Sequence, residues 1–155
     1  MRFISGMLTA LFIMHVAVAQ PVENKEQEQI KQAINHLFDG MRAGDSSMVQ
    51  AVFLENATMK TVGRNRDGKV ILNETSVKQF IAAVGGPKED VWDERLDGIE
   101  IKIDGDLASV WTPYHFFRGD TFSHCGVNAF QMMKTEEGWK VINIVDTRRR
   151  QGCKS

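Results

Sequence analysis

The stretch SHCGVNAF, residues 123–130, places a histidine beside a cysteine in an otherwise apolar run. Such a pair could form a thiolate nucleophile with its base, contribute to a metal site, or supply one side chain to a ligand pocket. If the run is a β-strand, His124 and Cys125 point to opposite faces of the sheet. This alternation argues against a Cys–His couple. His124 then either serves a pocket or is a histidine whose hydrogen bonds are satisfied within the sheet.

The metal-site alternative has little support in the sequence. His36, His115 and His124 do not show the short spacings that metal ligands share, and Cys125 lies far from Cys153. We therefore expect no metal and no cofactor.

Helical spacing marks the first part of the chain. Apolar residues recur three and four positions apart, at Ile30, Ala33, Ile34, Leu37, Phe38 and Met41. Gly44 ends this helix, and Asp45 or Ser46 is a suitable N-cap for a short second helix that reaches Phe53. Both helices should bury one apolar face.

A hairpin and a third helix are expected next. The turn-forming loop GRNRDG separates residues 57–62 from residues 69–72, which predicts two paired strands. Thr75 or Ser76 then precedes a run with Val77, Phe80, Ile81 and Val84 on one helical face, and Gly85-Gly86-Pro87 stops it.

The remainder of the chain reads as strands. Alternating apolar residues predict strands at 99–103, 108–117, 122–134 and 139–147. The order helix, helix, hairpin, helix and four-stranded meander predicts an α+β domain. We expect a cone-shaped, curved antiparallel sheet, with three helices from the N-terminal half packed on its concave face.

The sequence resembles the nuclear-transport-factor-2-like superfamily in three features. These are the order of the elements, the segment GDLASVW at the start of a strand, and the segment EEGWKVINIVD in the last hairpin. This superfamily includes ketosteroid isomerases and the SnoaL-like and putative lumazine-binding-like proteins. The resemblance covers roughly residues 24–150 and is strongest to exported members of unknown function. It implies a domain at residues 29–150, and it says little about chemistry because the fold hosts both enzymes and binding modules.

Strand register selects the side chains that should face the interior. A three-residue EEG turn would place Asn128 opposite Asp146, and the Asp104-Gly105 turn would place Arg95 opposite Tyr114. Joining the two inward faces requires a three-residue loop at RGDT or a bulge near Pro113. The predicted pocket residues are Arg95, Asp97, Thr112, Tyr114, Phe116, His124, Asn128, Asp146 and Arg148.

The start of the chain predicts export. Residues 1–19 have a basic start, an apolar stretch and a small-x-small ending, so they read as a signal peptide cleaved between Ala19 and Gln20. Residues 20–28 read as a flexible leader and residues 151–155 as a C-terminal tail. An exported protein reaches an oxidising compartment, where Cys125 and Cys153 could pair or stay free. Both outcomes are left open by the sequence.

Three functions are compatible with these features. The first is an exported small-molecule-binding module in which Arg95 or Arg148 pairs with the ligand. The second is an enzyme resembling ketosteroid isomerase or the SnoaL-like cyclases, with Asp146 or Asp97 as base and Tyr114 or His124 stabilising an oxyanion. The third is a structural module with a vestigial pocket that forms a homodimer through the convex sheet face. The net charge of −1 gives no reason to expect nucleic acid or, after cleavage, a membrane as partner.

Overall fold

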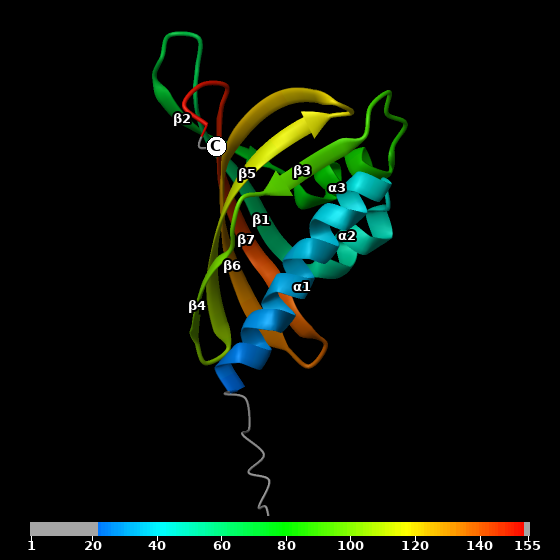
Figure 1. Cartoon of the computed structure of the whole chain (residues 1–155), viewed down its shortest axis with the longest axis vertical. Helices are drawn as coiled ribbons and strands as arrows, with labels where there is room; N and C mark the ends of the chain where they lie inside the picture. Colours follow the sequence, from blue (N-terminus) through cyan, green and yellow to red (C-terminus); the bar gives the residue numbers. More distant parts are fainter. Residues whose placement is uncertain (1–21, 154–155) are drawn as a thin grey trace, which may run out of the picture.

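The computed structural model describes residues 22–153, so the predicted signal peptide lies outside the described residues. Within 22–153 the chain forms three helices and a seven-stranded, curved, open sheet. The helices lie against the concave face of the sheet (Figure 1). The helices are α1 (Val22–Ala43), α2 (Ser46–Val52) and α3 (Val77–Gly85), and the strands are β1 (Phe53–Arg64), β2 (Val70–Thr75), β3 (Trp92–Leu96), β4 (Glu100–Asp104), β5 (Leu107–Arg118), β6 (Thr121–Thr135) and β7 (Gly138–Arg149). The predicted α+β class is confirmed.

The helices follow the signals in the sequence, with one correction. The Asp45 carboxylate accepts from the main-chain N–H groups of Ser47 and Met48, which caps α2 as expected. The prediction of a flexible leader is wrong from Val22 onward, where α1 already begins. Glutamate, lysine and glutamine are good helix formers, and an ion pair between Glu26 and Lys134 ties this first part of α1 to β6.

The sheet has the strand order β2-β1-β7-β6-β5-β3, with β4 also paired to β5. Every pairing is antiparallel except that of β1 with β7, which is parallel and departs from the expected all-antiparallel sheet. β1 and β7 are remote in sequence, so no short turn dictates their relative direction. Their pairing continues the concave surface across to the β1–β2 hairpin.

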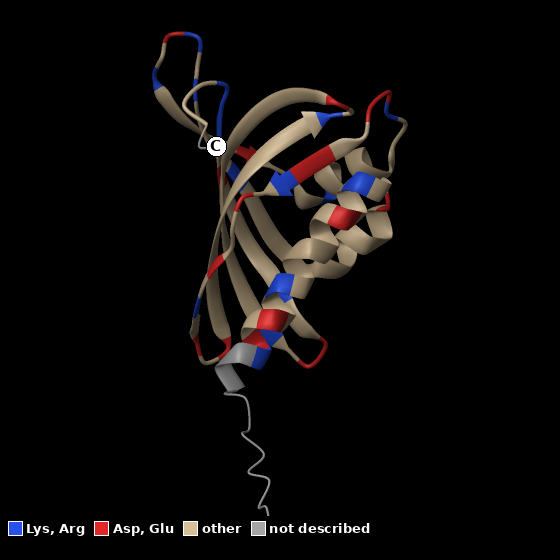
Figure 2. Ribbon diagram, in the orientation of Figure 1, with Lys and Arg blue, Asp and Glu red and all other residues tan. Residues whose placement is uncertain are grey.

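The core lies between α1 and the concave face. Ile30, Ile34 and Leu37 on α1 are buried against apolar residues of β5, β6 and β7, among them Val110 and Phe130. In Figure 2 the strands behind α1 are tan over most of their length. Apolar packing therefore fills the space between α1 and the sheet.

The expected single strand before β5 is split into β3 and β4. β4 pairs with β5 as far as Trp111, and β3 pairs with β5 from Tyr114 onward. Between them lies Pro113, which has no N–H to give to the ladder, and only the Asp97 N–H reaches the Pro113 carbonyl. One extra residue on the β3–β4 side forms a bulge, and a bulge of one residue exchanges the two faces of the strand beyond it.

Candidate functional site

The concave face and the helices line a partly open cavity of about 430 Å³. This volume is within the range of small-molecule sites. Its apolar wall comes from α1, α3 and the facing strands. That wall includes Leu37, Phe38, Met41, Phe80, Ala83, Trp92, Phe116, Phe130 and Ile144.

A buried hydrogen-bonded group forms one part of the polar wall. Asn128 on β6 donates through Nδ2 to Glu94 Oε1 on β3 at 2.7 Å, and its Nδ2 lies 3.4 Å from Thr112 Oγ1 on β5. Glu94 is only 9% exposed and Thr112 is fully buried. Asn128 thus holds the Glu94 carboxyl group in place, and Thr112 supports Asn128 from behind without lining the cavity.

Burial raises the pKa of Glu94 to about 7, although the hydrogen bond from Asn128 opposes this. The Asp146 carboxylate adds to the rise, and the Arg148 guanidinium acts against it. Near neutral pH the Glu94 carboxyl group is therefore divided between its neutral and charged forms. Such a group can donate or accept a proton inside the cavity.

The second polar group joins β5 to β7. Arg148 donates through Nε to Asp146 Oδ2 at 2.7 Å. The Tyr114 hydroxyl lies 3.0 Å from the Thr147 carbonyl oxygen, to which it donates, and 3.4 Å from Asp146 Oδ2. Burial, together with the carboxylates of Glu94 and Asp146, raises the pKa of Tyr114, so the phenol remains neutral.

His124 stands beside these groups on the cavity wall. Its ring lies 4.9 Å from the Phe116 ring, and its Nδ1 is 3.1 Å from the Ser123 hydroxyl. Burial lowers the pKa of His124, and the charges of Arg148, Arg118 and Arg150 lower it further, while Asp146 acts in the opposite direction.

The structure brings six of the predicted pocket residues together at one cavity. The cavity wall includes Tyr114, Phe116, His124, Asn128, Asp146 and Arg148. Asn128 lies opposite Asp146 as predicted, but the hairpin has a two-residue turn, and a bulge near Ile142 restores the register. In the β5–β6 ladder the register shifts at Ser123 and not near Pro113, and this bulge leaves His124 on the inward face as predicted.

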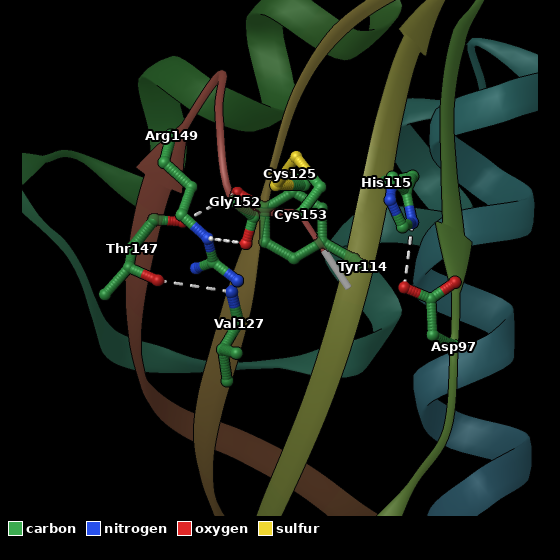
Figure 3. The surroundings of a disulfide bond; sticks show 9 residues. All are labelled: Asp97, Tyr114, His115, Cys125, Val127, Thr147, Arg149, Gly152 and Cys153. Carbon is green, nitrogen blue, oxygen red and sulfur yellow. Dashed lines mark hydrogen bonds and ion pairs between the residues drawn. A yellow bond between two sulfur atoms is a disulfide. The ribbon is translucent and has the colours of Figure 1, made fainter. Parts of the chain in front are cut away.

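The predicted placement of Arg95 and Asp97 in the pocket is wrong. The bulge opposite Pro113 turns both to the convex side, where Arg95 lies opposite His115 in the ladder and Asp97 Oδ2 lies 2.8 Å from His115 Nδ1 (Figure 3). The same bulge turns Glu94 inward, and sequence reasoning missed it. The signal that could have revealed this break in the ladder is Pro113, which cannot donate a main-chain hydrogen bond, opposite a segment that contains Gly98.

The two halves of the opening motif separate as predicted. His124 lines the cavity, whereas Cys125 is buried on the convex side and bonded to Cys153, with a Cα–Cα distance of 5.8 Å (Figure 3). The disulfide left open by the sequence is therefore present. It fastens the C-terminal tail behind the strand that carries His124.

Two searches of the described residues were negative. Within residues 22–153 no group of three or more His, Cys, Asp or Glu side chains is arranged to hold a metal ion. In the same part of the chain, no helix is long and apolar enough to cross a membrane.

Comparison with known families decides the classification. The profile of the family described as putative lumazine-binding matches residues 25–145. The chain belongs to this family. No curated protein matches the sequence.

Several solved structures described as NTF2-like proteins share the fold of this chain. An NTF2-like protein of unknown function from Shewanella baltica is 16% identical with a TM-score of 0.63, and the match covers 85% of this chain and all (100%) of that one. An NTF2-like protein with a cystatin-like fold from Novosphingobium aromaticivorans is 17% identical with a TM-score of 0.67, over 84% and 85% of the two chains. A protein from Streptomyces avermitilis, described as a putative dehydratase of the NTF2-like family, is 14% identical with a TM-score of 0.64, over 83% and 99%. At these identities the likeness shows the fold alone.

Proposed function

We propose that the protein is a small-molecule-binding module whose ligand occupies the cavity between α1, α3 and the concave sheet. The observation that carries this proposal is the cavity of about 430 Å³, which combines apolar walls with polar side chains. Ligand sites commonly combine these two properties. The family description supports a ligand-binding role and leaves the ligand to be identified.

The proposal is tested with the neutral fluorophore N-phenyl-1-naphthylamine, which fluoresces strongly in apolar surroundings. Ala83 lies on α3 at the cavity wall, so Ala83→Trp should fill the entrance and abolish the fluorescence increase. Ala82→Trp, an equal change on the neighbouring exposed position outside this cavity, is the control. Equal binding by both variants would place the probe elsewhere and refute the assignment. Mass spectrometry of small molecules that co-purify with the exported protein then identifies the natural ligand.

Acid–base catalysis is a second candidate, favoured by one observation. Glu94 is buried at the cavity wall with a pKa of about 7, as a proton-transfer group requires. The oxyanion would be stabilised by His124, because the Tyr114 hydroxyl already donates to the Thr147 carbonyl. This assigns the base to Glu94 in place of Asp146 or Asp97.

Deuterium exchange separates catalysis from binding alone. The wild type, incubated with 1-tetralone in D₂O, should accelerate exchange at the carbon beside the carbonyl, and Glu94→Gln should not. If wild-type protein exchanges the ketone no faster than buffer alone does, acid–base catalysis is refuted and the binding proposal is unaffected.

We also propose that the protein is exported and forms homodimers through the convex face. The Cys125–Cys153 disulfide supports export, because such bonds persist in oxidising compartments. Trp111, 49% exposed on the convex face, supports pairing of that face with a second copy. The intact mass of the exported protein should correspond to a chain that begins at Gln20. Light scattering should give a dimer mass for the wild type and a monomer mass for Trp111→Lys.

A further inference from the structure

Three arginines act on His124, and two of them line the cavity with it. Arg118 is the last residue of β5 and lines the cavity, as does Arg148 of β7. Arg150 follows β7 and acts on His124 electrostatically. This gathering is local, because the chain as a whole has a net charge of −1.

The arginines differ in how far their charge is already neutralised. Arg148 donates through Nε to Asp146, which offsets its charge. Arg118, in contrast, makes no ion pair or side-chain hydrogen bond with any residue between 22 and 153. A guanidinium is a strong donor to planar anions, so Arg118 is the cation with donors to offer a ligand.

The pKa of His124 reflects the charges of the same arginines. After burial, the next causes that lower its pKa are the charges of Arg148 and Arg118, and Asp146 does not outweigh them. Burial disfavours a charge of either sign, but the arginine charges that disfavour a protonated imidazole favour an anion at the same place.

The acidic residues of the cavity do not cancel this preference. Asp146 is paired with Arg148. Glu94 is hydrogen-bonded to Asn128, four residues from His124 along β6. Its carboxyl group is partly protonated near neutral pH, so it carries only part of a negative charge. Lys60 also lies at the cavity edge. Its neighbours on β1, Met59 and Thr61, pair with inward-facing residues of β7. Since side chains alternate along a strand, the side chain of Lys60 points outward.

We propose that the ligand of this cavity is an amphipathic organic anion, whose charged group lies beside His124 between Arg118 and Arg148. Its apolar body packs against Phe38 of α1 and Phe80 of α3, which line the same cavity. This inference rests on the proposed binding function and specifies the ligand class that the site takes. The carboxylates and sulfonates of ring-containing molecules have this chemistry.

The test uses two probes that share one apolar body. The first is 8-anilinonaphthalene-1-sulfonate, which is an anion, and the second is N-phenyl-1-naphthylamine, which lacks the sulfonate. Both are titrated against wild-type protein and against Arg118→Gln, Arg118→Lys and Arg66→Gln. Arg66 is an exposed arginine in the β1–β2 loop, outside the cavity, and controls for the change in net charge.

Arg118→Gln should weaken the anionic probe about tenfold, as expected for the loss of one hydrogen bond between charged groups, and should leave the neutral probe unchanged. Arg118→Lys should restore part of the affinity, and Arg66→Gln should bind both probes like the wild type. Circular dichroism confirms that each variant is folded.

The failures are distinguishable. If neither probe binds the wild type, the proposed binding function fails and the inference falls with it. If the neutral probe binds and Ala83→Trp blocks it, but the anionic probe is indifferent to Arg118→Gln, binding stands and the anionic class is refuted. Anionic binding that survives Ala83→Trp would place the anion outside the cavity and refute the inference as well.

Discussion

The Tyr114 hydroxyl donates to the Thr147 carbonyl oxygen at 3.0 Å, reaching across the position of Gly126 on the strand between them. This approach requires that the central residue has no side chain. A Cβ atom at Gly126 would lie 1.8 Å from the Thr147 oxygen and 2.8 Å from the Tyr114 hydroxyl. The glycine in the opening motif thus permits a bond between β5 and β7 at the polar end of the cavity.

Gly126→Ala should therefore destabilise the protein strongly. The Thr147 carbonyl is main chain and has little room to move, so we expect a loss of about 3 kcal/mol or more in the free energy of unfolding, at the upper end for overpacked sites. Chemical denaturation measures this loss. Gly98→Ala is the control, because nothing lies within 4 Å of a Cβ there, and it should change stability by less than about 0.5 kcal/mol. Equal effects of the two substitutions would contradict the packing argument.

The fold was predictable from the sequence because its signals are local. The spacing of Ile30, Ile34 and Leu37 marks the buried face of α1, and Asp45 caps α2 where expected. The pairing of Asn128 with Asp146 was also predicted, although a two-residue turn and a bulge produce it in place of a three-residue turn. Burial of the apolar face selects that register whichever route the turn takes.

The candidate site was predicted incompletely because bulges are not local signals. The exchange of Arg95 for Glu94 as the inward residue depends on one extra residue opposite Pro113. The parallel pairing of β1 with β7 joins segments that are distant in sequence. Only the assembled sheet determines these relationships.

The disulfide should stabilise the domain without shaping the cavity. Cys125 and Cys153 are 28 residues apart, and closing such a loop restricts the unfolded chain by about 3.5 kcal/mol in the chain-entropy model. Cys153→Ser should lower the free energy of unfolding by roughly that amount and leave binding of N-phenyl-1-naphthylamine unchanged. Wild-type protein under reducing conditions should match the variant. A loss of probe binding would instead assign the tail a role in holding the site.

Substitution of Phe130 should affect mainly the stability of the fold, and substitution of His124 mainly the binding of the anionic probe. Phe130 is fully buried and packs edge-on against Phe38, so Phe130→Ala should cost about 3–5 kcal/mol of stability. His124 is half-buried at the cavity wall, and His124→Ala should weaken the anionic probe with little change in stability. Denaturation and fluorescence titration of both variants check this. A large stability loss in His124→Ala would show that the imidazole is structural.

The last prediction concerns Glu94 and follows from its pKa of about 7, against an ordinary value of 4.5. Between these two values the unfolded chain loses the Glu94 proton while the folded chain retains it. The folded state then binds more protons, so the contribution of Glu94 to stability falls as pH rises through this window, by at most about 1.4 kcal/mol per pH unit. Above pH 7 both states are ionised and the contribution becomes constant.

Glu94→Gln removes this titration and keeps an oxygen that accepts from Asn128. The variant should therefore gain stability relative to the wild type between pH 5 and pH 8, by roughly 2 kcal/mol. Urea denaturation of both proteins across that range measures the difference. Glu89→Gln, at an exposed position in the loop before β3, should track the wild type at every pH. If the curves of Glu94→Gln and wild type run parallel, the Glu94 carboxyl group does not retain its proton in the folded cavity. The assignment of Glu94 as a proton-transfer group would then fail.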